Sequence, residues 1–107
     1  MADATEQAGQ WVEQGVAFSQ GGDSTQAMRC WEEAAALAPG WGVPHFLLGS
    51  ELAAQQAYAA AEAAFAQALL LDPQFLLARY QLGLLQFSSG RPALALLTWQ
   101  PLQQLPP

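Results

Sequence analysis

The strongest constraint on the fold is a pattern that recurs every 34 residues. When the chain is shifted by this length, three rows of identical residues and one aromatic row come into register. The rows are Gly15, Gly49 and Gly83; Ala27, Ala61 and Ala95; Pro39, Pro73 and Pro107; and Trp31, Phe65 and Trp99. Two weaker rows are Phe18, Leu52 and Gln86, and Ala34, Ala68 and Leu102. A period of this length is typical of proteins built from repeated helix pairs.

Each row has a physical explanation in a stack of helix pairs. Glycine on the first helix and alanine on the second leave room for the two backbones to approach closely. The aromatic row is expected to fill the space between one helix pair and the next. Proline ends the second helix, because it has no N–H and disfavours helix in the residue before it.

Capping residues and breakers divide the chain into six expected helices. Asp3 with Glu6, and Asp23 with Gln26, are typical of helix starts, and Pro44 and Pro92 suit a first helical turn. Pro101 is expected to kink or end the last helix near Trp99. The expected ranges are 3–20, 23–38, 43–55, 58–71, 74–87 and 92 to about 99.

The pattern resembles the tetratricopeptide repeat (TPR) family. That family combines a large residue, Leu-Gly, an aromatic, alanines, a second aromatic and a closing proline in 34 residues. The matching residues are Trp11, Gly15, Phe18, Ala27, Trp31, Ala34 and Pro39; then Leu48, Gly49, Leu52, Ala61, Phe65, Ala68 and Pro73; then Leu82, Gly83, Ala95, Trp99 and Pro107. The resemblance implies an all-α, right-handed superhelix with a single domain over residues 1–107. Its repeats would cover about 8–41, 42–75 and 76–107, the third degenerate and without a C-terminal capping helix.

The resemblance also implies a role in binding another protein without catalysis. In the family, the first helix of each repeat lines a concave groove that holds a peptide or a helix. By register, the lining here would be Val12, Val16, Ser19, Phe46, Ser50, Ala53, Tyr80, Leu84 and Phe87. This lining is apolar, so we expect an apolar segment of a partner, with Phe46 and Tyr80 as aromatic anchors. Some relatives hold C-terminal carboxylates with lysine, arginine and asparagine; this chain has no lysine or asparagine, and we expect no such clamp.

Composition and charge restrict the choice of partners further. The formal net charge is −6, and 52% of residues are hydrophobic against 11% charged. An acidic chain without clustered cations is a poor ligand for nucleic acid or anionic membranes. The N-terminal residues lack the basic and apolar regions of a signal peptide, and with the alanine, leucine and glutamine bias this leads us to expect a bacterial, cytoplasmic protein.

Candidate catalytic and metal-binding residues are few. His45 has no cysteine or carboxylate three or four residues away, and it occupies the register position of Trp11, so a packing role is expected. Cys30 cannot form an internal disulfide as the single cysteine, and only Arg29 offers a nearby cation to activate it. We therefore expect no enzyme activity, no cofactor and no metal.

The C-terminal segment leaves alternatives open. No charged residue follows Arg91, and Leu94, Leu96, Leu97, Trp99, Leu102 and Leu105 would form an apolar surface. Either this surface docks onto a continuation of a longer TPR protein, or a second copy covers it in a homo-oligomer. A further alternative is a TPR-type secretion chaperone that keeps the apolar segment of a translocator protein soluble.

Overall fold

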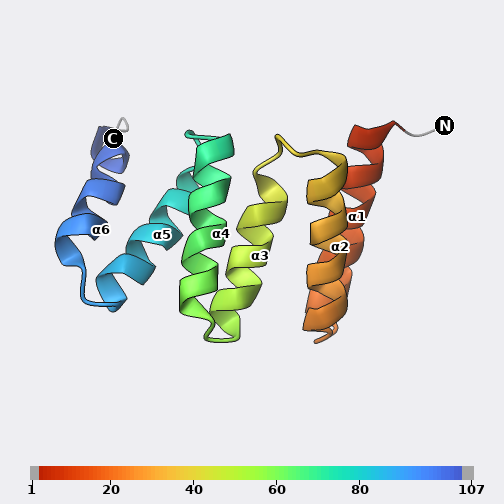
Figure 1. Ribbon diagram of the computed structural model, residues 1–107, viewed down its shortest axis with the longest axis horizontal. Helices are drawn as coiled ribbons and strands as arrows, with labels where there is room; N and C mark the ends of the chain where they lie inside the picture. The colour runs from red at the N-terminus through yellow and green to blue at the C-terminus, as the bar shows by residue number, and fades with distance from the viewer. Residues whose placement is uncertain (1–2, 105–107) are drawn as a thin grey trace.

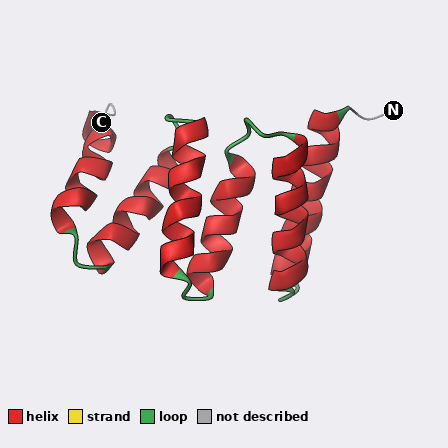
Figure 2. Ribbon diagram, viewed as in Figure 1, coloured by secondary structure: helices red, strands yellow, loops and turns green. Residues whose placement is uncertain are grey.

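The computed structural model describes residues 3–104, and within this range the chain forms six α-helices and no strand (Figures 1 and 2). A short 3-10 helix follows the last α-helix. The elements are α1 (Ala4–Gln20), α2 (Ser24–Leu37), α3 (Val43–Ala54), α4 (Tyr58–Leu71), α5 (Leu76–Ser88), α6 (Pro92–Trp99) and η1 (Gln100–Gln104). The all-α prediction with six helices is confirmed.

The helices form three antiparallel pairs, α1 with α2, α3 with α4, and α5 with α6, stacked in a row (Figure 1). The pairs are joined by contacts of α2 with α3 and of α4 with α5. The molecule is elongated, measuring 47 × 29 × 23 Å, with a radius of gyration of 14.5 Å. A compact domain of this length has a radius of about 13 Å, so each pair packs mainly against its neighbours along the row.

The predicted caps and breaks agree with the structure, with one correction. The carboxylates of Asp3 and Asp23 accept hydrogen bonds from the backbone N–H groups of Glu6 (2.8 Å) and Gln26 (3.1 Å). The last α-helix ends at Trp99, and the chain continues through Pro101 as a 3-10 helix. The predicted start of the fifth helix at residue 74 was two residues early, because the Asp72 carbonyl accepts from the Phe75 N–H (3.0 Å) and closes a turn there.

The three turns inside the helix pairs are built identically, and this was not predicted. Gly22, Gln56 and Gly90 stand 34 residues apart, and all three have positive φ angles of 84°, 65° and 82°. In each turn the next residue donates its N–H to a carbonyl five positions earlier, at 2.8–2.9 Å. The donors are Asp23, Ala57 and Arg91, and the acceptors are Phe18, Leu52 and Gln86. This is the Schellman arrangement, in which a left-handed residue ends the helix.

The glycine and aromatic rows of the 34-residue pattern are explained by contact between the glycine and the aromatic ring within each helix pair. A Cβ atom at Gly15 would lie 2.5 Å from Nε1 of Trp31, and one at Gly49 would lie 2.8 Å from Cε1 of Phe65. Gly83 is covered by Trp99 in the same way. The sequence-based interpretation is corrected accordingly: the aromatic ring lies on the glycine of its own repeat, and Phe65 additionally reaches the next repeat through Leu82.

The other packing residues lie at the contacts between helices. Ala27, Ala61 and Ala95 are fully buried, as are Ala34 and Ala68. Trp31 and Phe65 are 2% and 1% exposed, whereas Phe18 and Trp99 are partly buried. Ala61, Phe65 and Leu82 form a core cluster where the second and third pairs meet.

The departure from the pattern at Gln86 has a local explanation. Gln86 is 5% exposed and replaces the apolar Phe18 and Leu52 of the first two repeats. Its side-chain carbonyl accepts a hydrogen bond of 2.6 Å from the hydroxyl of Thr98. Thr98 in turn stands where repeat two has Ala64. The two polar residues therefore satisfy each other inside the third pair.

Candidate partner-binding surface

The predicted lining in the first two repeats is partly occupied by contacts within the molecule. Val12, Val16 and Ser19 on α1 are partly buried. The hydroxyl of Ser19 donates to Oε2 of Glu51 (3.0 Å), and the hydroxyl of Ser24 donates to Oε1 of the same carboxylate. Glu51 on α3 thus ties both helices of repeat one to repeat two, so Ser19 has a structural role as well.

The ring of Phe46, one of the two predicted anchors for a partner, packs against two other aromatic rings of the molecule. Its ring centroid lies 5.7 Å from that of Phe65 and 5.0 Å from that of Phe75. Ala53 packs against the same core cluster, whereas Ser50 is exposed. Replacing Phe46 would therefore also disturb packing, because the ring contacts Phe65 on α4 and Phe75 at the start of α5.

On α5, two pairs of apolar residues are available to a partner. Tyr80 and Phe87 are 48% and 57% exposed and lie on the side of α5 that faces Trp99. Leu77 is 61% exposed, and Leu84 is partly exposed. These two leucines are seven residues apart and therefore share a helix face, turned about 60° from the face of Tyr80 and Phe87. Leu77 is missing from the predicted lining, although its spacing from Leu84 could have revealed it.

The indole N–H groups of Trp31 and Trp99 are not available to form hydrogen bonds with a partner. Nε1 of Trp31 donates to the carbonyl of Val12 (3.3 Å), and Nε1 of Trp99 donates to the carbonyl of Tyr80 (3.1 Å). Val12 and Tyr80 are themselves in register, two repeats apart. Because both N–H groups have acceptors on the first helix, the tryptophans act as packing residues whose donors are satisfied.

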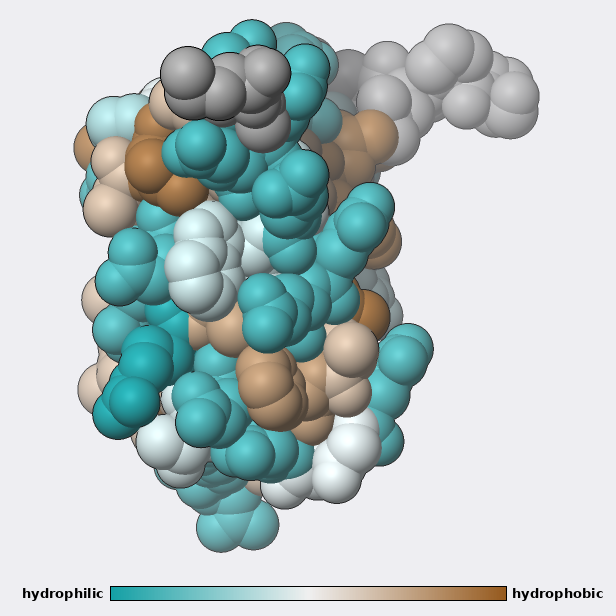
Figure 3. Space-filling view, turned by 90° about the vertical axis from the view of Figure 1, so that its right-hand side faces the viewer, coloured by the Kyte–Doolittle hydropathy of each residue, from teal (hydrophilic) through white to brown (hydrophobic). Residues whose placement is uncertain are grey.

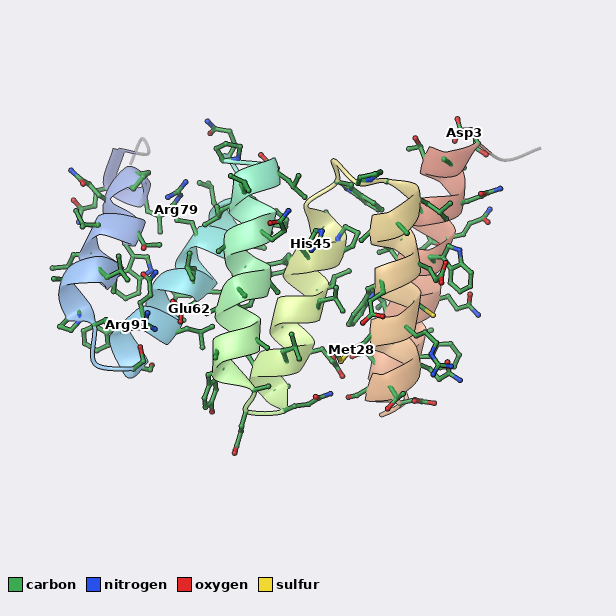
Figure 4. All side chains as sticks on the ribbon, viewed as in Figure 1. Asp3, Met28, His45, Glu62, Arg79 and Arg91 are labelled. Carbon is green, nitrogen blue, oxygen red and sulfur yellow. The ribbon has the colours of Figure 1, made fainter. Side chains whose placement is uncertain are left out.

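Both arginines of the third repeat, Arg79 and Arg91, form hydrogen bonds within the molecule (Figure 4). Arg91 donates from Nη1 and Nη2 to the two carboxylate oxygens of Glu62, at 2.9 and 2.6 Å. This hydrogen-bonded ion pair lowers the pKa of Glu62. Arg79 donates to the carbonyls of Thr98 (3.3 Å) and Pro73 (3.1 Å). Neither cation lies at a predicted lining position.

The titratable residues singled out in the sequence lie in unreactive surroundings. Burial raises the pKa of the Cys30 thiol, which disfavours the nucleophilic thiolate. Burial lowers the pKa of His45, so its neutral form is favoured at the position between helices (Figure 4). Within residues 3–104, no group of three or more His, Cys, Asp or Glu side chains is arranged to hold a metal ion. No helix in the same range is long and apolar enough to cross a bilayer.

The stacked helix pairs and their exposed apolar face define a helical-repeat solenoid. The tetratricopeptide repeat family model matches residues 44–75, which form its central pair. The match supports the family prediction for the central pair, and the chain as a whole has the fold of tetratricopeptide repeat domains. Comparison with curated proteins gives no match.

Solved structures with the same fold are TPR domains. The second TPR of Spaghetti (RPAP3), bound to the HSP90 peptide SRMEEVD, has a TM-score of 0.85 and 22% identity, covering 95% of this chain and 94% of that one. The TPR2B domain of yeast Sti1, in a complex with pHsp70, has a TM-score of 0.81 and 22% identity over 89% and 76% of the two chains. The Arabidopsis OM64 TPR domain has a TM-score of 0.81 and 20% identity over 91% and 80%. The predicted superhelix of helix pairs is thereby confirmed.

Proposed function

We propose that this protein is a non-enzymatic scaffold that holds an apolar segment of a partner protein against the first helices of its repeats. The observation that carries the proposal is a pair of leucines on α5 that share one helix face, the exposed Leu77 and the partly exposed Leu84. An apolar stripe of this kind on a folded surface is typical of a docking site for a helix or an extended segment. The cytoplasm, where such adaptors work, is the proposed location.

The structural neighbours support a protein-binding role in general. Two Spaghetti TPR domains were solved with the HSP90 peptide SRMEEVD, and the yeast Sti1 domain with pHsp70. Acidic peptide ends of this kind require cations in the receiving surface. Here Arg91 is paired with Glu62, and Arg79 donates to backbone carbonyls. The proposed ligand is therefore apolar, unlike SRMEEVD.

The same stripe also suits a secretion chaperone, which would cover the apolar segment of a translocator protein until export. The favouring observation is that the lining from Val12 and Val16 to Leu84 is almost free of charged side chains. Gene neighbourhood beside secretion components would favour this version. The physical test of the groove is identical for both versions.

The proposal is tested by selecting ligands from a phage-displayed library of random dodecapeptides. We expect peptides rich in leucine and aromatic residues, binding with dissociation constants in the micromolar range. The variant Leu77→Asp/Leu84→Ser should weaken this binding at least tenfold while leaving the melting temperature almost unchanged. Serine is the residue that repeat two carries at the position of Leu84, namely Ser50, so the repeat tolerates it. Synthetic SRMEEVD should show no saturable binding.

The matched control is Leu70→Asp. Leu70 is 76% exposed and lies on α4, two residues beyond the buried Ala68, on the side turned away from α3. This variant should bind the selected peptides like the wild type. Failure of the library to enrich apolar peptides, or equal binding by the double variant, would contradict the proposal.

A further inference from the structure

The end of the solenoid formed by α5 and α6 carries an apolar face, which we call the terminal face. It consists of Tyr80, Phe87, Leu96 and Trp99. Tyr80, Phe87 and Leu96 are 48%, 57% and 60% exposed, and Trp99 is partly exposed. The rings of Tyr80 and Phe87 stack on Trp99, with centroids 6.5 and 6.2 Å away. Within residues 3–104, α6 packs mainly against α5 and η1, and Tyr80, Phe87 and Leu96 remain about half exposed.

The corresponding residues of repeat two indicate what kind of surface packs against the terminal face. Thirty-four residues earlier, its four members correspond to Phe46, Ala53, Glu62 and Phe65 of repeat two. Phe46 contacts the ring of Phe75, Ala53 and Phe65 lie in the cluster around Leu82, and Glu62 binds Arg91. Leu82 and Arg91 belong to repeat three, and Phe75 is the N-cap residue of its first helix, α5. The terminal face is therefore the surface that, inside the solenoid, seats a neighbouring unit.

A second copy stacked head to tail would have to fill this surface with its N-terminal end. Two repeats earlier, the residues that correspond to Phe75, Leu82 and Arg91 are Gln7, Gln14 and Asp23. Two glutamines and an aspartate offer no apolar side chain for the rings of the terminal face. The view onto that end of the molecule is accordingly dominated by hydrophilic residues (Figure 3). A head-to-tail filament is disfavoured for this reason.

The charge distribution favours contact between two terminal faces. All nine acidic residues lie at or before Asp72, and no charged residue follows Arg91. Two terminal faces meet without like charges opposite each other, and the acidic first repeats then point away from each other. The indole N–H of Trp99 already has an acceptor in the Tyr80 carbonyl (3.1 Å), so burying the ring leaves no donor unsatisfied.

We propose that two copies of this chain associate end to end through their terminal faces, around a two-fold axis. Such an interface is self-complementary and closes at the dimer. Among the described residues, the open hollow beside it, of about 480 Å³, is lined by the uncharged side chains of Ala93, Leu96, Leu97, Gln100 and Gln103. Three large side chains half exposed on each copy bury on the order of 300 Å² per copy, a small interface. The dimer is accordingly weak, with dissociation in the range of tens of micromolar.

The test is sedimentation velocity of the 107-residue chain between about 5 and 500 μM, which brackets the expected dissociation constant. We expect the mass to rise from monomer to dimer and to stop there. Leu96→Glu, which introduces the residue that repeat two carries at Glu62, should keep the chain monomeric throughout with an unchanged circular dichroism spectrum. Leu70→Glu, at a leucine on α4 that is 76% exposed, should dimerise like the wild type. Phe87→Glu provides a second variant of the face.

Three results would overturn the proposal. A wild-type monomer over the whole range would assign the terminal face to a helix of another partner. Growth beyond the dimer would indicate open-ended stacking, and loss of association in Leu70→Glu would indicate a general charge effect. The groove variant Leu77→Asp/Leu84→Ser should still dimerise, and Leu96→Glu should still bind the selected peptides, so failure of either proposal can be recognised separately.

Discussion

The ring of Phe65 lies against the backbone of Gly49 so closely that a Cβ atom there would be 2.8 Å from Cε1 and 2.9 Å from Cδ1. Cβ atoms in proteins essentially never make contacts shorter than 3.0 Å. The glycine is thus required by a ring on the opposite helix of the same repeat, and the pair holds α3 and α4 together. Trp31 with Gly15 and Trp99 with Gly83 repeat the arrangement.

Substitutions at Gly49 and Phe65 should therefore destabilise the fold. Gly49→Ala forces the ring to move and should cost about 1–3 kcal/mol. Phe65→Ala leaves a cavity beside Leu82 and should cost about 3–5 kcal/mol. Urea unfolding followed by circular dichroism gives both values. The control is Gly9→Ala in α1, where nothing lies within 4 Å of the added Cβ; it should stabilise the chain by about 0.5–1 kcal/mol, and a loss there would undermine the account.

The left-handed turn positions offer a stabilising change. Gln56 has a φ of 65° where the other two repeats carry Gly22 and Gly90. A side chain in this conformation costs about 1–2 kcal/mol, partly offset by the greater flexibility of glycine in the unfolded chain. Gln56→Gly should raise the free energy of unfolding by about 0.5–1 kcal/mol, measured by thermal and urea unfolding. Gly22→Ala should lower it; an unchanged value for both variants would contradict the strain at this turn.

Much of this fold could be predicted from the sequence, because the 34-residue pattern occurs three times in the chain. The period, the caps at Asp3 and Asp23, and the helix end near Trp99 were all predicted. The turn row of Gly22, Gln56 and Gly90 was missed because glutamine hides the pattern. The partner of the aromatic row was also misjudged, since spacing places a ring on a helix face without showing which backbone it touches.

The hydrogen-bonded pair of Gln86 and Thr98 can be tested by a double-mutant cycle. Thr98→Ala leaves the Gln86 side chain without its donor and should cost about 1–3 kcal/mol. The double change Gln86→Leu/Thr98→Ala copies Leu52 and Ala64 of repeat two and should restore most of this loss. If the effects of Gln86→Leu alone and Thr98→Ala alone add up to the effect of the double change, the 2.6 Å hydrogen bond contributes nothing of its own to stability.

The stability should depend on pH through His45. Burial lowers its pKa in the folded state below the ordinary value of 6.5, so the unfolded chain takes up a proton first as the pH falls. The contribution of the neutral ring is complete above 6.5 and is lost progressively as the pH falls from there through the folded-state pKa. His45→Gln should flatten this part of the stability profile, measured as the melting temperature between pH 7 and pH 5.

The contribution of Glu62 to stability is lost over a more acidic pH range. Arg91 lowers the pKa of this carboxyl below its ordinary value of 4.5, so its contribution disappears only as the pH falls from there through the folded-state pKa. Glu62→Gln should leave the profile above pH 5 unchanged. An unaltered slope between pH 7 and pH 5 in His45→Gln would contradict the assignment to His45.

The proposed binding surface was less predictable than the fold. The register placed Tyr80, Leu84 and Phe87 on α5, but it could not separate the face that carries Leu77 from the face that stacks on Trp99. It also could not show that Phe46 is held between Phe65 and Phe75. Those distinctions depend on the angle at which successive pairs meet, which the pattern of one helix does not contain.

The most direct test of the proposed scaffold is a map of amide chemical-shift changes on the chain when a selected apolar peptide is added. The largest changes should lie on α1, α3 and α5, centred on Leu77 and Leu84, with little change on α2 and α4. Changes confined to α2, α4 or α6 would contradict the groove, because the peptide would then be held by the second helices of the repeats.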